Sequence, residues 1–80
     1  MSTAERALAV LVDIAEVAEI RQDPDVRLYD LHILDSLKTV ELMVAFSETF
    51  GVDISPAEFE REQWATPRKI VTYLEERVGA

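Results

Sequence analysis

A chain of 80 residues is long enough for one small domain and too short for two, so residues 1–80 are treated as a single domain. Sixteen acidic residues against eight basic ones give a net charge of −8, which disfavours nucleic-acid binding and favours protein partners with basic patches, or simply keeps the domain soluble. The absence of cysteine excludes disulfide bonds and thiolate metal sites.

The N-terminal segment predicts a helix and no targeting signal. The first six residues lack the basic stretch and apolar run of a signal peptide, and the longest apolar stretch, Ala7–Val12, is too short to span a membrane. We therefore expect a soluble, cytoplasmic protein without membrane insertion. The capping-box pattern of Ser2 and Glu5 predicts a helix from about Thr3 to Glu19. Apolar residues recur along it at near-helical spacing: Leu8, Leu11, Val12, Ala15 and Ile20.

Residues 21–34 are predicted to form a long ordered loop. Pro24 breaks any helix because it lacks an N–H donor and restricts the residue before it. A strand over Val26–Tyr29 would find no partner later in the chain. Loops of this length are usually functional or structured by their own packing. Five apolar side chains are expected to hold the loop on the core: Val26, Leu28, Leu31, Ile33 and Leu34.

A second helix is predicted from about Ser36 to Phe50. Asp35 is a favourable N-cap residue, and Gly51 stands where helices end in the left-handed conformation. At 3.6 residues per turn the apolar residues separate into two sets. The bulkier set is expected in the core: Leu42, Met43, Phe46 and Phe50. The other set is expected on an exposed edge: Leu37, Val40 and Val44, beside Ser36, Glu41, Ser47 and Glu48.

This exposed edge suits a transient protein partner, because a few apolar anchors contribute affinity while acidic side chains steer the encounter. The alternative is that the edge is buried against the preceding loop.

Two further helices are predicted in the C-terminal part. Ser55-Pro56 begins a short helix from Pro56 to about Glu62, with Phe59 facing inward, and Thr66-Pro67 begins a last helix from Pro67 to about Val78. Trp64 is expected to be a large packing residue. One face of the last helix is apolar: Ile70, Val71, Leu74 and Val78. The fold class is therefore all-α: a four-helix bundle of three main helices and one short helix.

Asp35 and Ser36 are the residues whose role the patterns leave open. Read alone, Asp35 caps the helix and Ser36 is a harmless first-turn residue. A serine at the positive end of the helix dipole could also carry a phosphodiester, although nothing in the physics demands one. A hydrolase is not supported, because His32 is the single histidine and no third group orients it. No metal or nucleotide motif occurs in the sequence.

Leu34-Asp35-Ser36-Leu37, followed by Thr39-Val40-Glu41-Leu42, resembles the phosphopantetheine attachment motif of carrier proteins. Length, acidity, absent cysteines and the four-helix plan agree with that family over essentially the whole chain. Within it, the run from Glu58-Phe59 to Trp64-Ala65-Thr66-Pro67 is similar to the D-alanyl carrier proteins, and also to stand-alone aminoacyl and acyl carriers of natural-product pathways.

The resemblance implies an acyl-carrier-protein-like, monomeric, non-catalytic carrier. Ser36 would bear a covalent 4'-phosphopantetheine arm, donated by coenzyme A through a phosphopantetheinyl transferase. The arm would hold an aminoacyl or acyl thioester, with D-alanine as the first candidate, loaded by an adenylating ligase and passed to an acceptor acyltransferase or synthase. The implied docking residues are Asp35, Leu37, Lys38, Val40, Glu41, Val44 and Glu48.

Two positions depart from the family pattern. His32-Ile33 stands where D-alanyl carriers tend to have a glycine, and Lys38 stands where many carriers have glycine or an acid. Two other functions stay open: a carrier for polyketide or macrolactam biosynthesis, and an acidic helical adaptor that is not modified.

Overall fold

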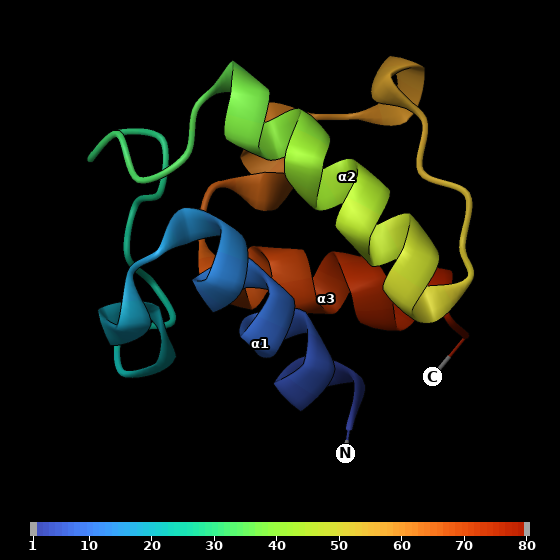
Figure 1. Ribbon diagram of the computed structural model, residues 1–80, viewed down its shortest axis with the longest axis horizontal. Helices are drawn as coiled ribbons and strands as arrows, with labels where there is room; N and C mark the ends of the chain where they lie inside the picture. The colour runs from blue at the N-terminus through green and yellow to red at the C-terminus, as the bar shows by residue number, and fades with distance from the viewer. Residues whose placement is uncertain (1, 80) are drawn as a thin grey trace.

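The computed structural model describes residues 2–79, without the side chain of Glu58. Three α-helices, α1 (Thr3–Ala15), α2 (Ser36–Phe50) and α3 (Pro67–Arg77), are joined by three short 3₁₀ helices: η1 (Ala18–Arg21), η2 (Pro56–Glu58) and η3 (Arg61–Trp64). α1 packs against both α2 and α3, and the loop that precedes α2 closes one side of the molecule (Figure 1). No strand occurs in residues 2–79. The all-α class is confirmed.

The bounds of α2 agree with those predicted, and local signals at both ends explain the agreement. The Asp35 side chain accepts a hydrogen bond from the Lys38 N–H at 2.9 Å, which occupies one of the first N–H groups of the helix. Gly51 ends the helix with φ +66°, and its N–H donates to the Ser47 carbonyl.

Helix α1 is shorter than predicted. It begins at Thr3 under the cap of Ser2, whose hydroxyl accepts from the Glu5 N–H at 3.1 Å. It ends at Ala15 because Glu16 adopts a left-handed conformation with φ +61°. The separate turn η1 then brings Ile20 into the core, where it is buried. The spacing of Ile20 therefore correctly predicted a core position. The prediction that one continuous helix leads to it is wrong.

The helix predicted from Pro56 to Glu62 is not found in the described residues. Two 3₁₀ helices occupy the segment, separated by extended backbone at Phe59 and Glu60. The extended backbone accompanies ring contacts of Phe59 with Trp64 and with Tyr29, at centroid distances of 5.4 and 6.5 Å. A segment this short gains too few intrahelical hydrogen bonds to outweigh such packing. The fold thus has three α-helices, and the predicted count of four is not confirmed.

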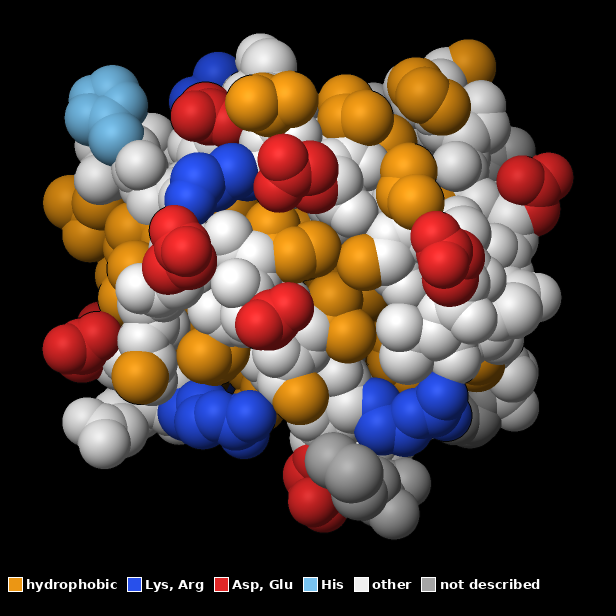
Figure 2. Space-filling model, viewed as in Figure 1, with side chains coloured by type: hydrophobic (Ala, Val, Ile, Leu, Met, Phe, Trp, Pro, Cys, Tyr) orange, Lys and Arg blue, Asp and Glu red, His pale blue; other side chains and the backbone are white. Residues whose placement is uncertain are grey.

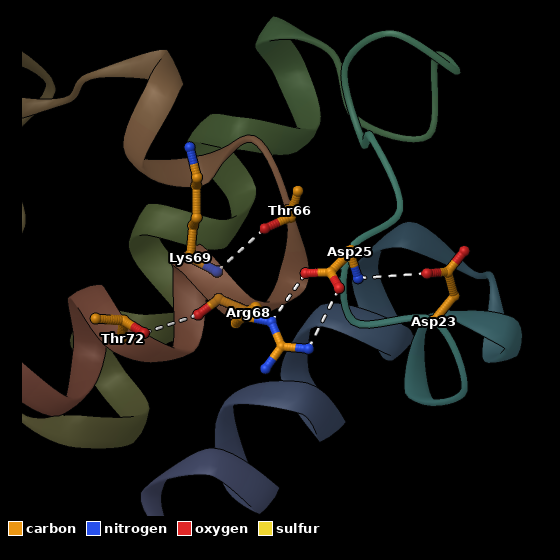
Figure 3. A network of polar contacts seen from close by, with 6 residues as sticks. All are labelled: Asp23, Asp25, Thr66, Arg68, Lys69 and Thr72. Atoms are coloured by element: carbon orange, nitrogen blue, oxygen red, sulfur yellow. Dashed lines mark hydrogen bonds and ion pairs between the residues drawn. The ribbon is translucent and has the colours of Figure 1, made fainter.

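Helix α3 starts where Thr66-Pro67 predicted and ends one residue before Val78. The Thr66 hydroxyl accepts from the Lys69 N–H at 3.2 Å, and Pro67 occupies the first turn. The loop before α2 is tied to this end of α3. The Arg68 N–H donates to the Pro24 carbonyl at 2.9 Å, and the Arg68 guanidinium pairs with the Asp25 carboxylate (Figure 3).

The loop over residues 21–34 is ordered by buried leucines and backbone hydrogen bonds. Leu28 and Leu34 are buried, and the Leu28 N–H donates to the Ala65 carbonyl at 2.9 Å. Val26 and Ile33 pack partly against the core. Leu31 does not: its side chain is 61% exposed, so the expectation that it holds the loop on the core is wrong. A turn over Tyr29–His32, with φ +60° at His32, points Leu31 outward.

Aromatic rings fill the centre of the core. Trp64 is buried and lies edge-on to Phe46 and to Tyr73, at centroid distances of 5.6 and 5.7 Å. The packing role predicted for Trp64 is confirmed. Because Trp64 sits between residues of α2 and α3, η3 joins these two helices. Within the described residues, no helix combines the length and apolar character that crossing a bilayer requires.

Candidate functional site

Ser36 is the first residue of α2, and its side chain is exposed. The first intrahelical hydrogen bond runs from the Thr39 N–H to the Asp35 carbonyl, at 2.9 Å. The N–H groups of Ser36 and Leu37 therefore precede any intrahelical acceptor and point out of the helix end. An anion linked to the Ser36 hydroxyl would meet these N–H groups and the positive end of the helix dipole.

A short chain of hydrogen bonds holds the backbone beside Ser36. The Thr39 hydroxyl lies 2.7 Å from the Asp35 carbonyl and 2.7 Å from the Tyr29 hydroxyl. A carbonyl oxygen only accepts, so the single proton of Thr39 is donated to Asp35. Tyr29 must then donate its proton to Thr39. The loop before α2 thus stabilises the N-cap through Tyr29 and Thr39.

An open groove of about 560 Å³ adjoins Ser36. Its walls come from the loop before α2, from the first turns of α2 and from the segment around η2 and η3. The lining combines apolar and polar side chains: Tyr29, His32, Leu34, Asp35, Ser36, Thr39, Met43, Pro56, Phe59 and Arg61. A flexible group attached to Ser36 would therefore have a surface to lie on.

Arg61 places a positive charge on this groove. Its guanidinium carbon lies 4.7 Å from the centre of the Tyr29 ring, a cation–π contact. Burial raises the pKa of Tyr29 above its ordinary value of 10.0, while the Arg61 cation acts in the opposite direction. Tyr29 thus stays protonated and continues to donate to Thr39 at neutral pH.

The edge of α2 predicted to be exposed is exposed, except that Ser47 is half-buried. Leu37, Val40 and Val44 have 69%, 51% and 54% of their surfaces accessible, whereas Leu42, Met43 and Phe46 of the bulkier set are buried. The alternative, burial of this edge against the preceding loop, is excluded. Glu41 and Glu48 are also exposed, and Figure 2 shows hydrophobic and acidic side chains interspersed on the face where α2 lies.

Lys38 and His32, the two departures from the family pattern, lie in different settings. The Lys38 side chain is half-buried, and its Nζ lies 3.4 Å from the Ile14 carbonyl in the last turn of α1. A cation there interacts favourably with the negative, C-terminal end of the α1 dipole. His32 is exposed on the groove beside Ser36. Its φ of +60° is the conformation that glycine adopts most readily.

Sequence patterns did not reveal the roles of three residues of this site. Thr39 is buried one turn after Asp35, a spacing at which threonine often bonds to the carbonyl four residues earlier. Tyr29 and Arg61 lie on separate segments, and no spacing along the chain links either of them to Ser36. In residues 2–79, no group of three or more histidine and carboxylate side chains is arranged to hold a metal ion.

Comparison with known proteins shows which proteins the chain is similar to. A family model described as "phosphopantetheine attachment site" matches residues 5–74. Proteins named D-alanyl carrier protein match almost end to end. Those of Listeria welshimeri, Staphylococcus saprophyticus and Staphylococcus xylosus are 37%, 38% and 40% identical. The matches cover 94%, 95% and 95% of this chain and 96%, 97% and 97% of theirs.

The residues present fit a phosphopantetheine group. It requires an accessible hydroxyl, a setting that tolerates a phosphodiester and room for an arm of amide units. Ser36 is exposed at a helix N-terminus with N–H groups directed outward, and the groove beside it is lined by both apolar and polar side chains. Carriers of this kind present a bound group to enzymes and do not themselves catalyse its transfer. The chain belongs to the family of proteins with a phosphopantetheine attachment site.

Proposed function

We propose that Ser36 carries the 4'-phosphopantetheine arm and that the chain is a stand-alone D-alanyl carrier. Three features of Ser36 support its assignment: it is exposed, it is the first residue of α2, and it lines the groove. The near-complete match to proteins named D-alanyl carrier protein supports the cargo. When bound, the arm supplies a thiol that holds the cargo as a thioester.

Attachment of the arm requires a transferase and coenzyme A. The bond from Ser36 Oγ to phosphorus forms as the pyrophosphate bond of coenzyme A breaks, and 3',5'-ADP leaves. The hydroxyl proton passes to a base of the transferase. Asp35 contributes by holding the helix end: its carboxylate accepts from the Lys38 N–H, and its carbonyl accepts twice from Thr39. These hydrogen bonds stabilise the backbone that presents Ser36 at the start of α2.

The exposed edge of α2 is the proposed docking surface for the transferase, for an adenylating ligase and for an acceptor enzyme. Its apolar anchors are Leu37, Val40 and Val44, and Glu41 and Glu48 steer basic partners to them. Asp35 and Lys38 flank the attachment point and complete the surface. We expect the protein in the cytoplasm, because the proposed transferase and ligase require coenzyme A and ATP, which are available there.

The single observation that carries the proposal is the exposed hydroxyl of Ser36 at the start of α2, within the matched residues 5–74. Incubation with coenzyme A and a phosphopantetheinyl transferase should add one arm, measured by intact-protein mass spectrometry. Ser36→Ala should block the addition, and Ser47→Ala on the same helix should leave it intact. A wild-type chain that gains no mass while another carrier is modified would refute the assignment.

The cargo is tested separately, on protein isolated from its own host. The mass of the modified chain should exceed that of the bare-arm form by one alanyl group. Hydroxylamine, which cleaves thioesters, should remove the excess mass, leave the free thiol of the arm and release the alanyl group as D-alanine hydroxamate. Release of a different acyl or aminoacyl group would retain the carrier function and replace D-alanine as its cargo.

A further inference from the structure

The groove beside Ser36 has an unusual charge distribution for so acidic a chain. Besides Ser36 itself, its lining contains one carboxylate, Asp35, and one guanidinium, Arg61. A phosphodiester on Ser36 would add negative charge next to Asp35, and two like charges that close repel each other. A nearby cation would offset the repulsion.

Arg61 is the cation placed to do so. Lys38 follows Ser36 closely in sequence, but its Nζ is directed to the Ile14 carbonyl and it does not line the groove. Arg61 lines the same groove as Ser36, and its side chain is exposed. Among the ion pairs found in the described part of the chain, none involves Arg61. Its guanidinium is therefore not committed to a carboxylate there.

Arg61 can exchange its cation–π contact with Tyr29 for a stronger partner. The Tyr29 ring is half-buried but the Arg61 side chain is exposed, so their cation–π contact is modest, whereas a guanidinium binds a phosphate through two parallel, charge-assisted hydrogen bonds. Arginine is better suited to this exchange than lysine, because its planar donors match the phosphate oxygens.

We propose that Arg61 leaves the Tyr29 ring and pairs with the phosphodiester once an arm is attached to Ser36. The exchange would turn the phosphate toward the groove, so that the arm runs over Met43 and Phe59 instead of outward into solvent. This inference rests on the proposed function, since it needs an arm on Ser36. It assigns to Arg61 a positioning role that the match to the family does not provide.

The experiment compares the full-length chain before and after attachment of the arm, with mass spectrometry confirming each state. Nuclear magnetic resonance then follows three groups: the Tyr29 ring, the Nε–H of Arg61 and the phosphorus of the arm. On attachment, the Tyr29 ring signals should shift as the guanidinium leaves. Exchange of the Arg61 Nε–H with water should slow several-fold as it becomes hydrogen-bonded.

Two variants separate a specific pair from a general effect of charge. Arg61→Gln should abolish the shift at Tyr29 and move the phosphorus resonance. Arg27→Gln is the matched control, because Arg27 also carries one positive charge but pairs with Asp30 and does not line the groove. This variant should leave the Tyr29 shift and the phosphorus resonance as in the wild type. His32→Asn tests the imidazole that shares the groove and is expected to have no effect. Asparagine also tolerates the φ of +60° at that position.

The remaining outcomes distinguish failure of the proposed function from failure of the role proposed for Arg61. A chain that gains no mass refutes the proposed function, and the role of Arg61 is refuted with it. Attachment with unmoved Tyr29 and Arg61 signals refutes the role of Arg61 alone. The same holds if the Tyr29 shift persists in Arg61→Gln, since the arm itself would then reach the ring. Equal phosphorus shifts in Arg61→Gln and Arg27→Gln, or a shift in His32→Asn only, also refute it.

Discussion

The hydrogen bonds that join Tyr29, Thr39 and the Asp35 carbonyl predict a specific pattern of stability losses. Thr39→Val keeps the shape of a buried side chain but removes its donor to Asp35, at a cost of about 1 kcal/mol. It also leaves the half-buried Tyr29 hydroxyl without its acceptor, which costs about 1 kcal/mol more. We expect Thr39→Val to lower the free energy of unfolding by about 2 kcal/mol.

Tyr29→Phe should cost less. It removes one hydrogen bond, about 1 kcal/mol, and leaves no polar group unpaired, because Thr39 still donates to Asp35. In the double variant both bonds are lost but no hydroxyl is stranded, so its cost should be about 2 kcal/mol instead of the sum of about 3. The coupling energy between the two side chains should therefore be about 1 kcal/mol.

Urea unfolding followed by circular dichroism measures these differences. With a slope of about 1 kcal/mol per molar urea, the midpoint of Thr39→Val should fall by about 2 M. Thr39→Ser, which keeps the hydroxyl, serves as the matched control and should lose less than Thr39→Val. Additivity of the two single changes to within about 0.5 kcal/mol would contradict a hydrogen bond between Tyr29 and Thr39. An equal cost for Tyr29→Phe and Thr39→Val would contradict the order in which Tyr29 donates to Thr39 and Thr39 donates to Asp35.

Three other changes test separate features. Glu16→Gly should raise the free energy of unfolding by about 1 kcal/mol, read from the thermal midpoint, because glycine adopts φ +61° without strain; a lower midpoint would contradict this. The Arg68 guanidinium holds the pKa of Asp25 below its ordinary value of 3.8. Asp25→Asn should therefore be less stable than the wild type at neutral pH, and the difference should vanish as the pH falls through the lowered pKa. A stability difference between Asp25→Asn and the wild type that grew on acidification would contradict this expectation. If Val40 anchors the docking surface, Val40→Asp should reduce kcat/KM for loading by the adenylating ligase about tenfold or more. The free energy of unfolding should stay within about 0.5 kcal/mol of the wild type, because Val40 is exposed.

Local signals in the sequence were enough to predict α2 and the start of α3. An N-cap residue, a helical apolar period and a terminal glycine or proline act within a few residues of one another. The same period separated the buried set of α2 from its exposed edge. Ser36 could be placed in the first turn of α2 for this reason, because a cap and a first-turn position are properties of the adjacent sequence. Its role as an attachment point came from the resemblance to the family motif.

Tertiary contacts decided the features that the local patterns misread. Phe59 packs on Trp64 and Tyr29, and its backbone extends where a helix was predicted. The chain reverses at Glu16 to bury Ile20, which shortened the first helix. Leu31 is exposed although its apolar side chain predicted a core position, because the turn that contains Leu31 directs the side chain outward.

The setting of Ser36 depends on both levels. Its place at the start of α2, and the family motif around it, could be read from the sequence alone. The groove, the donor chain from Tyr29 and the approach of Arg61 join segments that lie apart along the chain. No periodicity or spacing encodes such contacts, because they form only when packing around Trp64 holds α2, α3 and the loop together.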